Sequence, residues 1–432
     1  MHERVCLLGS PIRSNAFCYD FAMKVIEGAI STAKHFERLD DLHMEYILHN
    51  RSLTICNLTF LMRTTPPDHI DMTRWRSHIS ESLQRLLGLA HEPPDEMLVQ
   101  AGFSVKNGGL GLKWNEDYSV AAYVASVSAS KNIVRRLVRN EHWEVTGFEE
   151  YVNWLNERTR DEHRLTTAEM ATPRKLQKRL CDSLDLSRFD DLTESMPVRE
   201  VARMRGIAGD THAGDWPKGT PNRNLFLKFD NREFRSALRY RMGAFLFKKG
   251  AECAQCSKRI DRFGDHAVHC KKGGFLTARH NAVQRFFLKY ASAAGLNPRK
   301  EVLGLTPAAG KNDRPGDICI DIDAGVTVAY DVSIISPLQN AFVKKSAQDP
   351  TNVFWEGEQR KHNKYKADEN GMIAEKVQLV PLIISTLGAV SDSVVDFVNT
   401  IAQELHWKWG YSVGRQKDTG TVDVNDEPQI YE

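Results

Sequence analysis

The sequence has no apolar run long enough to cross a membrane, and its first residues lack the basic, apolar and small-residue succession of a secretory signal. It also lacks a disulfide framework, because five of its eight cysteines are scattered, at positions 6, 18, 56, 181 and 319. These absences argue against a membrane partner and against secretion. We therefore expect a protein of a reducing, intracellular compartment.

Strong overall charge is absent as well, because 58 Lys and Arg residues nearly balance 56 Asp and Glu residues, leaving a net charge of +2. The balance is uneven along the chain. Residues 223–314 contain twenty Lys or Arg and only seven Asp or Glu. Such a basic stretch suits a nucleic-acid backbone, although a solvated helical surface can have the same composition.

The length of 432 residues predicts about two to four domains. In the N-terminal half, apolar residues recur at helical spacing over residues 17–34, 39–63, 72–89 and 118–138. The Gly-Gly-Leu-Gly-Leu stretch at 108–112 predicts a tight turn. Residues 141–215 mix helix formers with charged runs, and we expect an extended connector there. We assign no chemistry to this half.

Two amphipathic helices are expected farther along the chain. In residues 230–247 the apolar face is Phe234, Leu238, Met242 and Phe245, and the other faces carry Arg232, Arg235, Arg239 and Arg241. In residues 277–296 the expected inward set is Val283, Phe286, Phe287 and Tyr290. Arg279 and His280 are expected at the start of this second helix, where they are equally consistent with a phosphate site and with solvated surface.

Between these two helices lies a motif with the spacing of a metal knuckle, Cys-x2-Cys-x9-His-x3-Cys. Its residues are Cys253, Cys256, His266 and Cys270. Thiolates and imidazole are the ligands that zinc prefers, and four of them leave no open coordination position. The motif therefore predicts a structural zinc site, in which His269 could take the place of His266. Buried free cysteines are the simpler alternative.

A β-hairpin is expected next, because residues 316–322 and 326–335 alternate β-forming residues around Asp-Ala-Gly. The hairpin would bring Asp317 close to Asp331. An unpaired carboxylate within the apolar second strand would be costly, which favours a role for Asp331 over a simple surface charge. Paired carboxylates can hold Mg²⁺ or Mn²⁺, and such ions serve the hydrolysis of phosphodiesters.

Lysines near these aspartates would complete such a site. Lys361 and Lys364 lie one turn apart in a helix expected over residues 356–370, so one can point at the metal while the other meets the DNA backbone. Glu301, ahead of the first strand, is a further candidate carboxylate. For Glu301 and Lys361, a surface charge is the more common explanation.

The motifs occur in an order that resembles the C-terminal part of non-long-terminal-repeat retrotransposon proteins with a restriction-like endonuclease. They are Cys-x2-Cys, Gly-Asp-His-Ala-Val-His-Cys, Arg-His-Asn, Arg-Pro-Gly-Asp, Asp-Val-Ser-Ile-Ile-Ser-Pro-Leu-Gln and Lys-His-Asn-Lys-Tyr. Upstream, Leu-Leu-Gly-Ser-Pro near residue 7, residues 60–67 and the Gly-Gly-Leu-Gly-Leu turn are similar to the thumb and connector of such reverse transcriptases. The resemblance covers most of the chain.

The resemblance implies a multidomain fold with a mostly α-helical N-terminal half, a small zinc knuckle and a C-terminal α/β nuclease of the PD-(D/E)xK type. The implied domains are thumb-like helices at 1–90, a helical connector at 91–248, the knuckle at 249–276 and the endonuclease at 277–416. Residues 417–432 form an acidic tail that we expect to be disordered.

The resemblance also implies a role for each candidate residue. Cys253, Cys256, His266 and Cys270 would bind zinc. Asp317 and Asp331 would bind the catalytic magnesium or manganese, and the catalytic set would include Lys364, Lys361 and Glu301. Contacts to nucleic acid would come from Arg279, His280, Arg314 and Tyr365.

Two features depart from the pattern of that family. Gly316 stands between Pro315 and Asp317, and the usual Glu-x-Lys is replaced by Asp-Val-Ser at 331–333, so the lysine must come from the later helix. The polymerase palm, which needs an aromatic-x-Asp-Asp motif, is also missing. The pair at 40–41 follows Arg-Leu and the pair at 190–191 follows Phe189 without the spacer, so both are predicted to be surface acids. We expect a fragment without polymerase activity.

The expected function is a Mg²⁺-dependent endonuclease that nicks double-stranded DNA so that its 3′ end can prime reverse transcription. By resemblance it would act in the nucleus, with element RNA as a second partner. Two alternatives use the same residues: a zinc-containing nucleic-acid-binding remnant without catalysis, and a resolvase-like nuclease on branched DNA. Metal-dependent cleavage would separate the first alternative, and a preference for junctions would identify the second.

Overall fold

The structure is a computed structural model that describes residues 5–7, 9–12, 14–114, 116–222, 227–303, 305, 314–322, 325–366 and 376–409. It is 60% helical with a small mixed sheet of four strands in the C-terminal part, which agrees with the expected fold class at this coarse level. The chain forms two compact units. The first comprises Met1–Ala278, Ile334–Gln359 and Ile383–Val390, and the second comprises Arg279–Ser333, Arg360–Leu382 and Ser391–Glu432.

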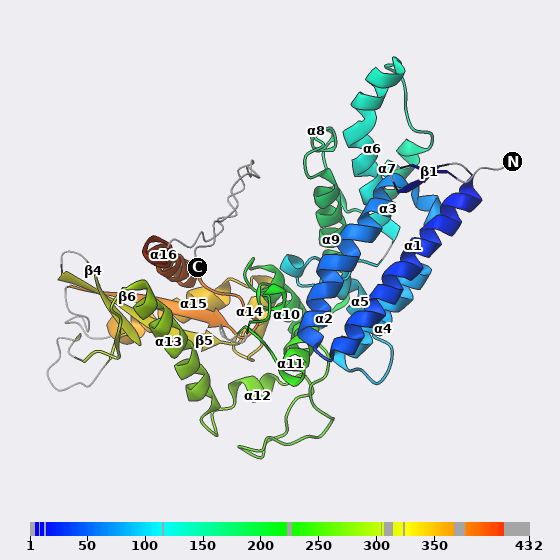
Figure 1. The fold of residues 1–432 in the computed structure, drawn as a ribbon. Coiled ribbons are helices and arrows are strands. Elements are labelled where there is room, and N and C mark those ends of the chain that lie inside the picture. Colours follow the sequence, from blue (N-terminus) through cyan, green and yellow to red (C-terminus); the bar gives the residue numbers. More distant parts are fainter. Residues whose placement is uncertain are drawn as a thin grey trace, which may run out of the picture. The chain divides into compact units, whose positions relative to one another are not determined.

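The first unit starts with an antiparallel pair of short strands and continues as helices around one apolar core. Trp75, Ile79 and Leu83 of the fourth helix are fully buried in this core. The helix expected at 39–63 is interrupted, because a π-helix at His49–Leu58 separates two α-helical parts. Figure 1 shows these elements: β1 (Val5–Leu7), β2 (Ser10–Ile12), α1 (Asn15–Phe36), α2 (Leu42–Leu48), α3 (Thr59–Thr64), α4 (Thr73–Leu87) and α5 (Asp95–Gly102).

The middle of the chain is helical, so the extended connector expected at 141–215 is wrong. These residues fold because Leu155, Leu176 and Leu180 pack with Val120 and Val124 in a second apolar cluster. Polar residues interrupt the apolar stripe of the helix that carries Leu176 and Leu180, because Ser183, Asp185 and Ser187 are buried there as well, which is why the pattern was missed. The helices are α6 (Glu116–Val138), α7 (Phe148–Glu157), α8 (Thr167–Met170), α9 (Leu176–Ser195) and α10 (Val198–Ala208).

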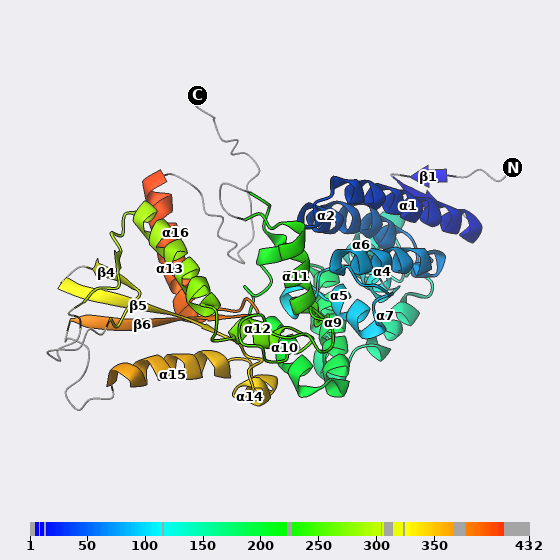
Figure 2. The same cartoon turned by 90° about the horizontal axis from the view of Figure 1, so that it is seen from below.

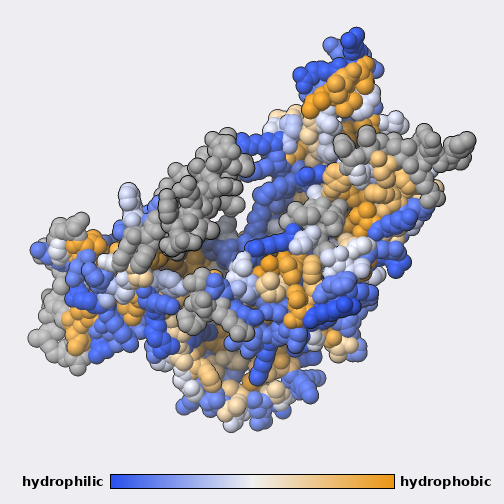
Figure 3. All heavy atoms as spheres, viewed as in Figure 1, coloured by the Kyte–Doolittle hydropathy of each residue, from blue (hydrophilic) through white to orange (hydrophobic). Residues whose placement is uncertain are grey.

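Short 3₁₀ turns join these helices at Glu37–Leu39, Pro67–His69, Val105–Asn107, Asp161–His163 and Trp216–Lys218. The C-terminal end of α6 exposes several apolar side chains. There the side chains of Ile133, Leu137 and Val138 are exposed, and Figure 3 shows apolar atoms at this end of the helix.

The tight turn predicted at 108–112 is present. Gly108 and Gly111 have φ angles of +88° and +73°, and a Cβ at Gly109 would lie 2.2 Å from the carbonyl oxygen of Phe103. Arg241 donates hydrogen bonds to the carbonyl oxygen of Gly109 and is only 3% exposed. Arg241 lies off the expected apolar face and is nevertheless buried, because its guanidinium satisfies buried carbonyls of this turn.

The helix expected at 230–247 is α11 (Asn231–Met242), which ends where Gly243 adopts a φ of +68°. Phe234, Leu238 and Met242 are buried as expected. Phe245, expected on the same face, lies beyond the helix and is 44% exposed. The helix is thus shorter than the apolar spacing implied.

The second unit contains the sheet, whose strands neighbour one another in the order β3 (Arg299–Lys300), β4 (Ile318–Ile322), β5 (Val326–Ile335) and β6 (Val377–Ser385). β3, β4 and β5 pair in antiparallel fashion. β5 and β6 run parallel, because the N–H of Thr327 donates to Lys376 and the N–H of Thr386 donates to Ile335. β4 and β5 confirm the expected hairpin, although Asp323 and Ala324 of its turn lie outside the described residues.

Helices cover both faces of this sheet, and Figure 2 shows α13 and α16 on one face and α15 on the other. The Phe397 ring of α16 stacks on Tyr330 of β5 at 4.1 Å and contacts Phe287 of α13 at 5.4 Å. β5, α15 and β6 have residues in both units. The remaining helices are α12 (Asp265–His269), α13 (Phe275–Ala294), α14 (Val343–Gln348), α15 (Asn352–Lys366) and α16 (Asp392–Trp409).

The buried face of α13 differs from the expected one. Gln284, Phe287, Ala291 and Ala294 are buried, whereas Phe286 is 51% exposed. The buried face includes Gln284 because its side-chain amide donates a hydrogen bond to the backbone oxygen of Asp317, just before β4.

Two of the expected absences can be compared with the structure. Within the described ranges, no helix combines the length and the apolar character needed to span a membrane. The seven cysteines whose side chains are described are all free thiols. Cys56 and the predicted acidic tail at 417–432 lie outside the described side chains.

Candidate functional site

The four knuckle residues lie together in the first unit. Their ligand atoms are all within 4.8 Å of one another, with Cys253 Sγ 3.8 Å from Cys270 Sγ and Cys256 Sγ 3.2 Å from His266 Nε2. Four ligands bound to zinc at about 2.3 Å would be about 3.8 Å apart, so the spacing fits. The cluster could hold a metal such as zinc. It uses His266, whereas His269 is outside it.

Local backbone structure holds the knuckle ligands in place. Asp261 accepts hydrogen bonds from the N–H groups of Asp265 and His266, at 2.9 and 2.7 Å, and so fixes the start of α12. The backbone N–H of Gln255 lowers the pKa of Cys253 to about 6. A thiolate is thereby favoured at neutral pH, and thiolates are the form in which cysteine binds metal.

The second candidate site lies at the start of β4, in the second unit. The strands pair Ile318 with Tyr330, and the N–H of Asp317 donates to Tyr330 at 2.8 Å. Continuing this register by one residue places Asp317 opposite Asp331. The two carboxyl groups are close enough to change each other's pKa. The structure thus brings together the two aspartates that the sequence singled out.

Asp317 is held as a carboxylate. His280 Nε2 lies 3.1 Å from Asp317 Oδ1, and the N–H of Val332 donates to Oδ2 at 2.7 Å. Burial acts to raise the pKa of Asp317, but the hydrogen bond and charge of His280 outweigh it, so the pKa is lowered. The same hydrogen bond raises the pKa of His280.

Asp331 has the opposite electrostatic setting. Its residue is 5% exposed, and burial, opposed by the charge of Lys361, raises the pKa of Asp331 to about 6. Lys361 Nζ donates to Oδ1 at 2.8 Å. Oδ2 is buried without a hydrogen-bond partner among the described residues. A buried carboxylate oxygen without a described partner, beside a second carboxylate, could coordinate a hard cation.

The structure distinguishes the two candidate lysines. Lys361 contacts Asp331, whereas Lys364 is exposed and donates to the hydroxyl of Tyr365 at 3.0 Å. Tyr365 is 2% exposed and packs with Cys319 in the core of the second unit. The helix expected at 356–370 corresponds to α15, which covers Asn352–Lys366, and residues 367–370 lie outside the described part of the chain.

Glu301 and Arg314 pair with each other, at 2.5 Å between Glu301 Oε2 and Arg314 Nη1. Gln284 links this pair to the site, because its amide donates to Glu301 Oε1 at 3.4 Å and to the backbone oxygen of Asp317 at 3.0 Å. Sequence reasoning missed Gln284. The available signal was a glutamine among the apolar residues of an amphipathic helix, since a buried amide needs partners.

Arg279 and His280 do not lie at a helix N-terminus as expected. α13 begins at Phe275, so both residues follow its first turn, where backbone N–H groups are used within the helix. A phosphate site built from that N-terminus is therefore wrong for these residues. His280 instead reaches the Asp317 carboxylate.

Steric crowding explains why glycine stands at position 316, where the sequence departs from the family pattern. A Cβ at this position would lie 2.8 Å from the Cβ of Ala329 and 3.0 Å from its Cα. β4 therefore approaches β5 too closely for a side chain there. The glycine allows Asp317 to sit beside Asp331 despite the changed motif.

The Asp-Asp pairs predicted to be surface acids have structural partners. Asp41 accepts from the N–H of Met44 at the start of α2, and Asp191 pairs with Arg160. Asp190 lies 2.5 Å from His163 and, with Glu162, forms a second group able to hold a metal. That group is at the surface and its Asp–His pair is already hydrogen-bonded.

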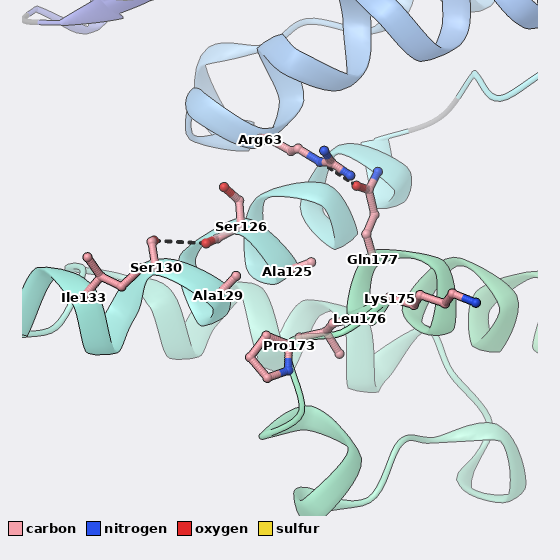
Figure 4. Close-up of a pocket in the computed structure, with 10 residues that line it drawn as sticks. All are labelled: Arg63, Ala125, Ser126, Ala129, Ser130, Ile133, Pro173, Lys175, Leu176 and Gln177. Carbon is pink, nitrogen blue, oxygen red and sulfur yellow. Dashed lines mark hydrogen bonds between the residues drawn. The ribbon is translucent and has the colours of Figure 1, made fainter. Parts of the chain in front are cut away.

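The first unit also has a cavity of about 450 Å³ between α6 and the start of α9, shown in Figure 4. The side chains drawn there are mostly small or apolar, such as Ala125, Ala129 and Leu176. The dashed lines mark a hydrogen bond between Arg63 and Gln177 and one from Ser130 to the backbone of Ser126. The lining offers no pair of acid and base groups, in contrast to the aspartate site.

Comparison with known proteins adds no family to this geometry. No protein-family model matches the chain, and no curated protein matches it either. The functional assignment therefore depends on the site and on the motifs of the sequence.

Proposed function

We propose that this chain is a metal-dependent DNA endonuclease module of the retrotransposon type. The observation that carries the proposal is the half-buried Asp317 beside the buried Asp331, whose Oδ2 has no hydrogen-bond partner among the described residues and whose Oδ1 lies 2.8 Å from the Lys361 ammonium. This arrangement has the carboxylates to hold a divalent cation and a cation to meet a phosphate. The metal would supply charge neutralisation and Lewis acidity toward the scissile phosphodiester.

The residues of the chain have separate parts in this proposal. Asp317 and Asp331 hold the divalent metal, and the N–H of Val332 and the imidazole of His280 orient the Asp317 carboxylate. Lys361 orients Asp331 and presents its charge to the phosphate. Gln284 ties the backbone of Asp317 to α13, so that the strand end keeps its position.

The finer parts of the proposal follow the sequence resemblance. They are a PD-(D/E)xK fold for the second unit, a structural zinc in the knuckle, target nicking that primes reverse transcription, and a nuclear place of action. The substrate is double-stranded DNA, with the basic stretch at 223–314 as the contact to its backbone.

The test is nicking of supercoiled plasmid by the purified chain with Mg²⁺. We expect nicking by the wild type and none by the Asp317→Asn/Asp331→Asn double variant, because both metal carboxylates are lost. Asp321→Asn is the matched control, since Asp321 lies on the same strand β4 and its carboxylate is 60% exposed. DNA binding without nicking by the wild type would refute the enzyme and favour the nucleic-acid-binding remnant.

A second pair of substrates distinguishes target nicking from a resolvase-like activity. A four-way junction and a linear duplex of equal length are incubated with the protein in parallel. We expect no preference for the junction. A strong preference would replace target nicking by a resolvase-like activity at the same residues.

A further inference from the structure

A second cavity of the first unit combines aromatic walls with acidic groups. It has a volume of about 270 Å³ and lies between α1, the Pro67–His69 turn, α6 and α7. None of the described residues that line it is basic. Its polar and aromatic lining consists of Tyr19, Asp68, Asp71, Glu116, Tyr151 and Trp154.

The walls of this cavity are held in place by hydrogen bonds. Tyr151 and Trp154 lie three residues apart on α7 and therefore share one face of the helix. The hydroxyl of Tyr151 donates to Asp68 at 2.8 Å, and that of Tyr19 donates to Asp71 at 3.5 Å. Tyr151 also packs edge-on against Tyr123, with ring centroids 5.4 Å apart. The aromatic rings and carboxylates thus form an ordered pocket.

An aromatic ring and a carboxylate already bind a cation elsewhere on this part of the protein. The guanidinium of Arg158 lies 3.7 Å over the ring of Trp154, and its Nε is 3.3 Å from Asp117. Arg158 does not line the cavity. The indole of Trp154, which also lines the cavity, therefore already holds one guanidinium beside a carboxylate, and this shows that aromatic and acidic side chains bind a cation in this part of the structure.

We propose that this cavity binds the side chain of a lysine, an N-methylated lysine or an arginine from a basic segment of a protein partner. Aromatic faces attract such cations, and the carboxylates supply the opposite charge. The volume lies below the usual range of about 300–1,000 Å³ for drug-sized ligands, which suits one long side chain better than a cofactor. Asp68 and Glu116 are exposed and can pair with basic residues that flank the inserted one.

A polyanion is the wrong ligand for this cavity. Three carboxylates line it, and Glu150 of α7 adds a negative charge that acts on Tyr151. Nucleic acid would be repelled here, whereas a basic peptide would be attracted. The proposal is independent of the nuclease proposal, because the cavity contains none of the residues of the aspartate site.

The experiment measures binding of a fluorescein-labelled peptide with a central trimethyl-lysine between two lysines, by fluorescence anisotropy. Companion peptides carry unmodified lysine, arginine or glutamine at the centre. We expect the three cationic peptides to bind and the glutamine peptide to bind about tenfold more weakly. Equal binding of the glutamine peptide would overturn the insertion of a cationic side chain.

Variants then locate the binding. Asp68→Asn/Glu116→Gln removes two charges while keeping side-chain shape, and we expect binding weaker by about tenfold. Glu96→Gln is the matched control, because Glu96 is also exposed and does not line the cavity. Wild-type affinity in the double variant, with unchanged circular dichroism, would overturn the proposal.

Two further measurements separate this inference from a small-amine ligand and from the nuclease proposal. Tetramethylammonium and lysine amide compete for the same site, and displacement at concentrations equal to the peptide's would replace the peptide partner by a small amine. The Asp317→Asn/Asp331→Asn variant should bind the peptide as the wild type does, so failure of the nuclease and failure of this cavity are distinguishable.

Discussion

The knuckle and the aspartate pair differ in the chemistry and in the number of the ligands that each could offer to a metal. The knuckle offers three thiols and one imidazole within 4.8 Å, a soft and complete set. The aspartate pair offers two carboxylates, one of which has a buried oxygen that no described group satisfies. A complete soft set stabilises structure, whereas an incomplete hard set leaves room for water and a substrate phosphate.

The partners around the two sites differ in the same way. Around the knuckle, backbone N–H groups position the ligands and favour a thiolate at Cys253. Around the aspartates, the side chains of His280 and Lys361 contact the carboxylates, and Lys361 brings a positive charge to Asp331. The comparison teaches that one site offers four soft ligands fixed by the backbone, whereas the other offers two carboxylates contacted by charged side chains. If the proposed function holds, the first site retains its metal and the second exchanges it, and both expectations can be tested.

The largest expected effect is a complete dependence of nicking on Mg²⁺. Dialysis into magnesium-free buffer should abolish nicking, and added Mg²⁺ should restore it, because two carboxylates alone bind this cation weakly and exchange it. Zinc measured by atomic absorption should remain at one per chain throughout. Nicking that persists without Mg²⁺, or zinc lost together with it, would remove the contrast between the sites.

Loss of one knuckle ligand should destabilise the first unit. We expect Cys256→Ser to lose zinc and to lower the free energy of unfolding by on the order of 3 kcal/mol, because metal binding there contributes to folding. Denaturant unfolding and zinc content are the measurements. Cys6→Ser is the control, since Cys6 is exposed and outside the knuckle, and it should retain both stability and zinc.

Substitution of the two lysines of α15 should affect the nicking rate to different extents. Lys361→Met should lower the nicking rate by about 100-fold, because it removes the cation bound to Asp331, and Lys364→Met by no more than about threefold. Single-turnover nicking rates at saturating Mg²⁺ are compared. A larger loss at Lys364 than at Lys361 would make Lys364 the catalytic lysine, and an equal loss would contradict the distinction between the two lysines.

The smallest expected effect is a pH-dependent difference in stability without metal. The pKa of Asp331 is raised to about 6 by burial, so the folded state holds its proton more tightly than the unfolded state does. The wild type should therefore lose stability relative to Asp331→Asn as the pH rises from about 4 to about 6, and the difference should stay constant from pH 7 to 8. Thermal unfolding of both proteins across this range is the measurement. A difference that does not change with pH would mean that Asp331 titrates normally.

Several parts of the fold followed from sequence because they depend on local patterns. Apolar spacing predicted α1, α4 and α6, and the alternation around Asp-Ala-Gly predicted the pairing of β4 with β5. The helices within 141–215 were missed, because their leucines are buried by contacts with Val120 and Val124 of α6, which no local pattern within 141–215 reveals. Helix ends were also inexact, since Gly243 ends α11 through its own backbone conformation.

The sequence by itself determined which residue types can do chemistry: the spacing of Cys253, Cys256, His266 and Cys270, and the placement of two aspartates on adjacent strands. Only the tertiary structure decided that Lys361 donates a hydrogen bond to Asp331 and that His280 contacts the Asp317 carboxylate. It also decided that Gln284 donates a hydrogen bond to the backbone oxygen of Asp317. The physical reason is that covalent spacing and backbone periodicity are local, whereas burial, the resulting pKa values and the partner of each charge depend on which distant segments pack together.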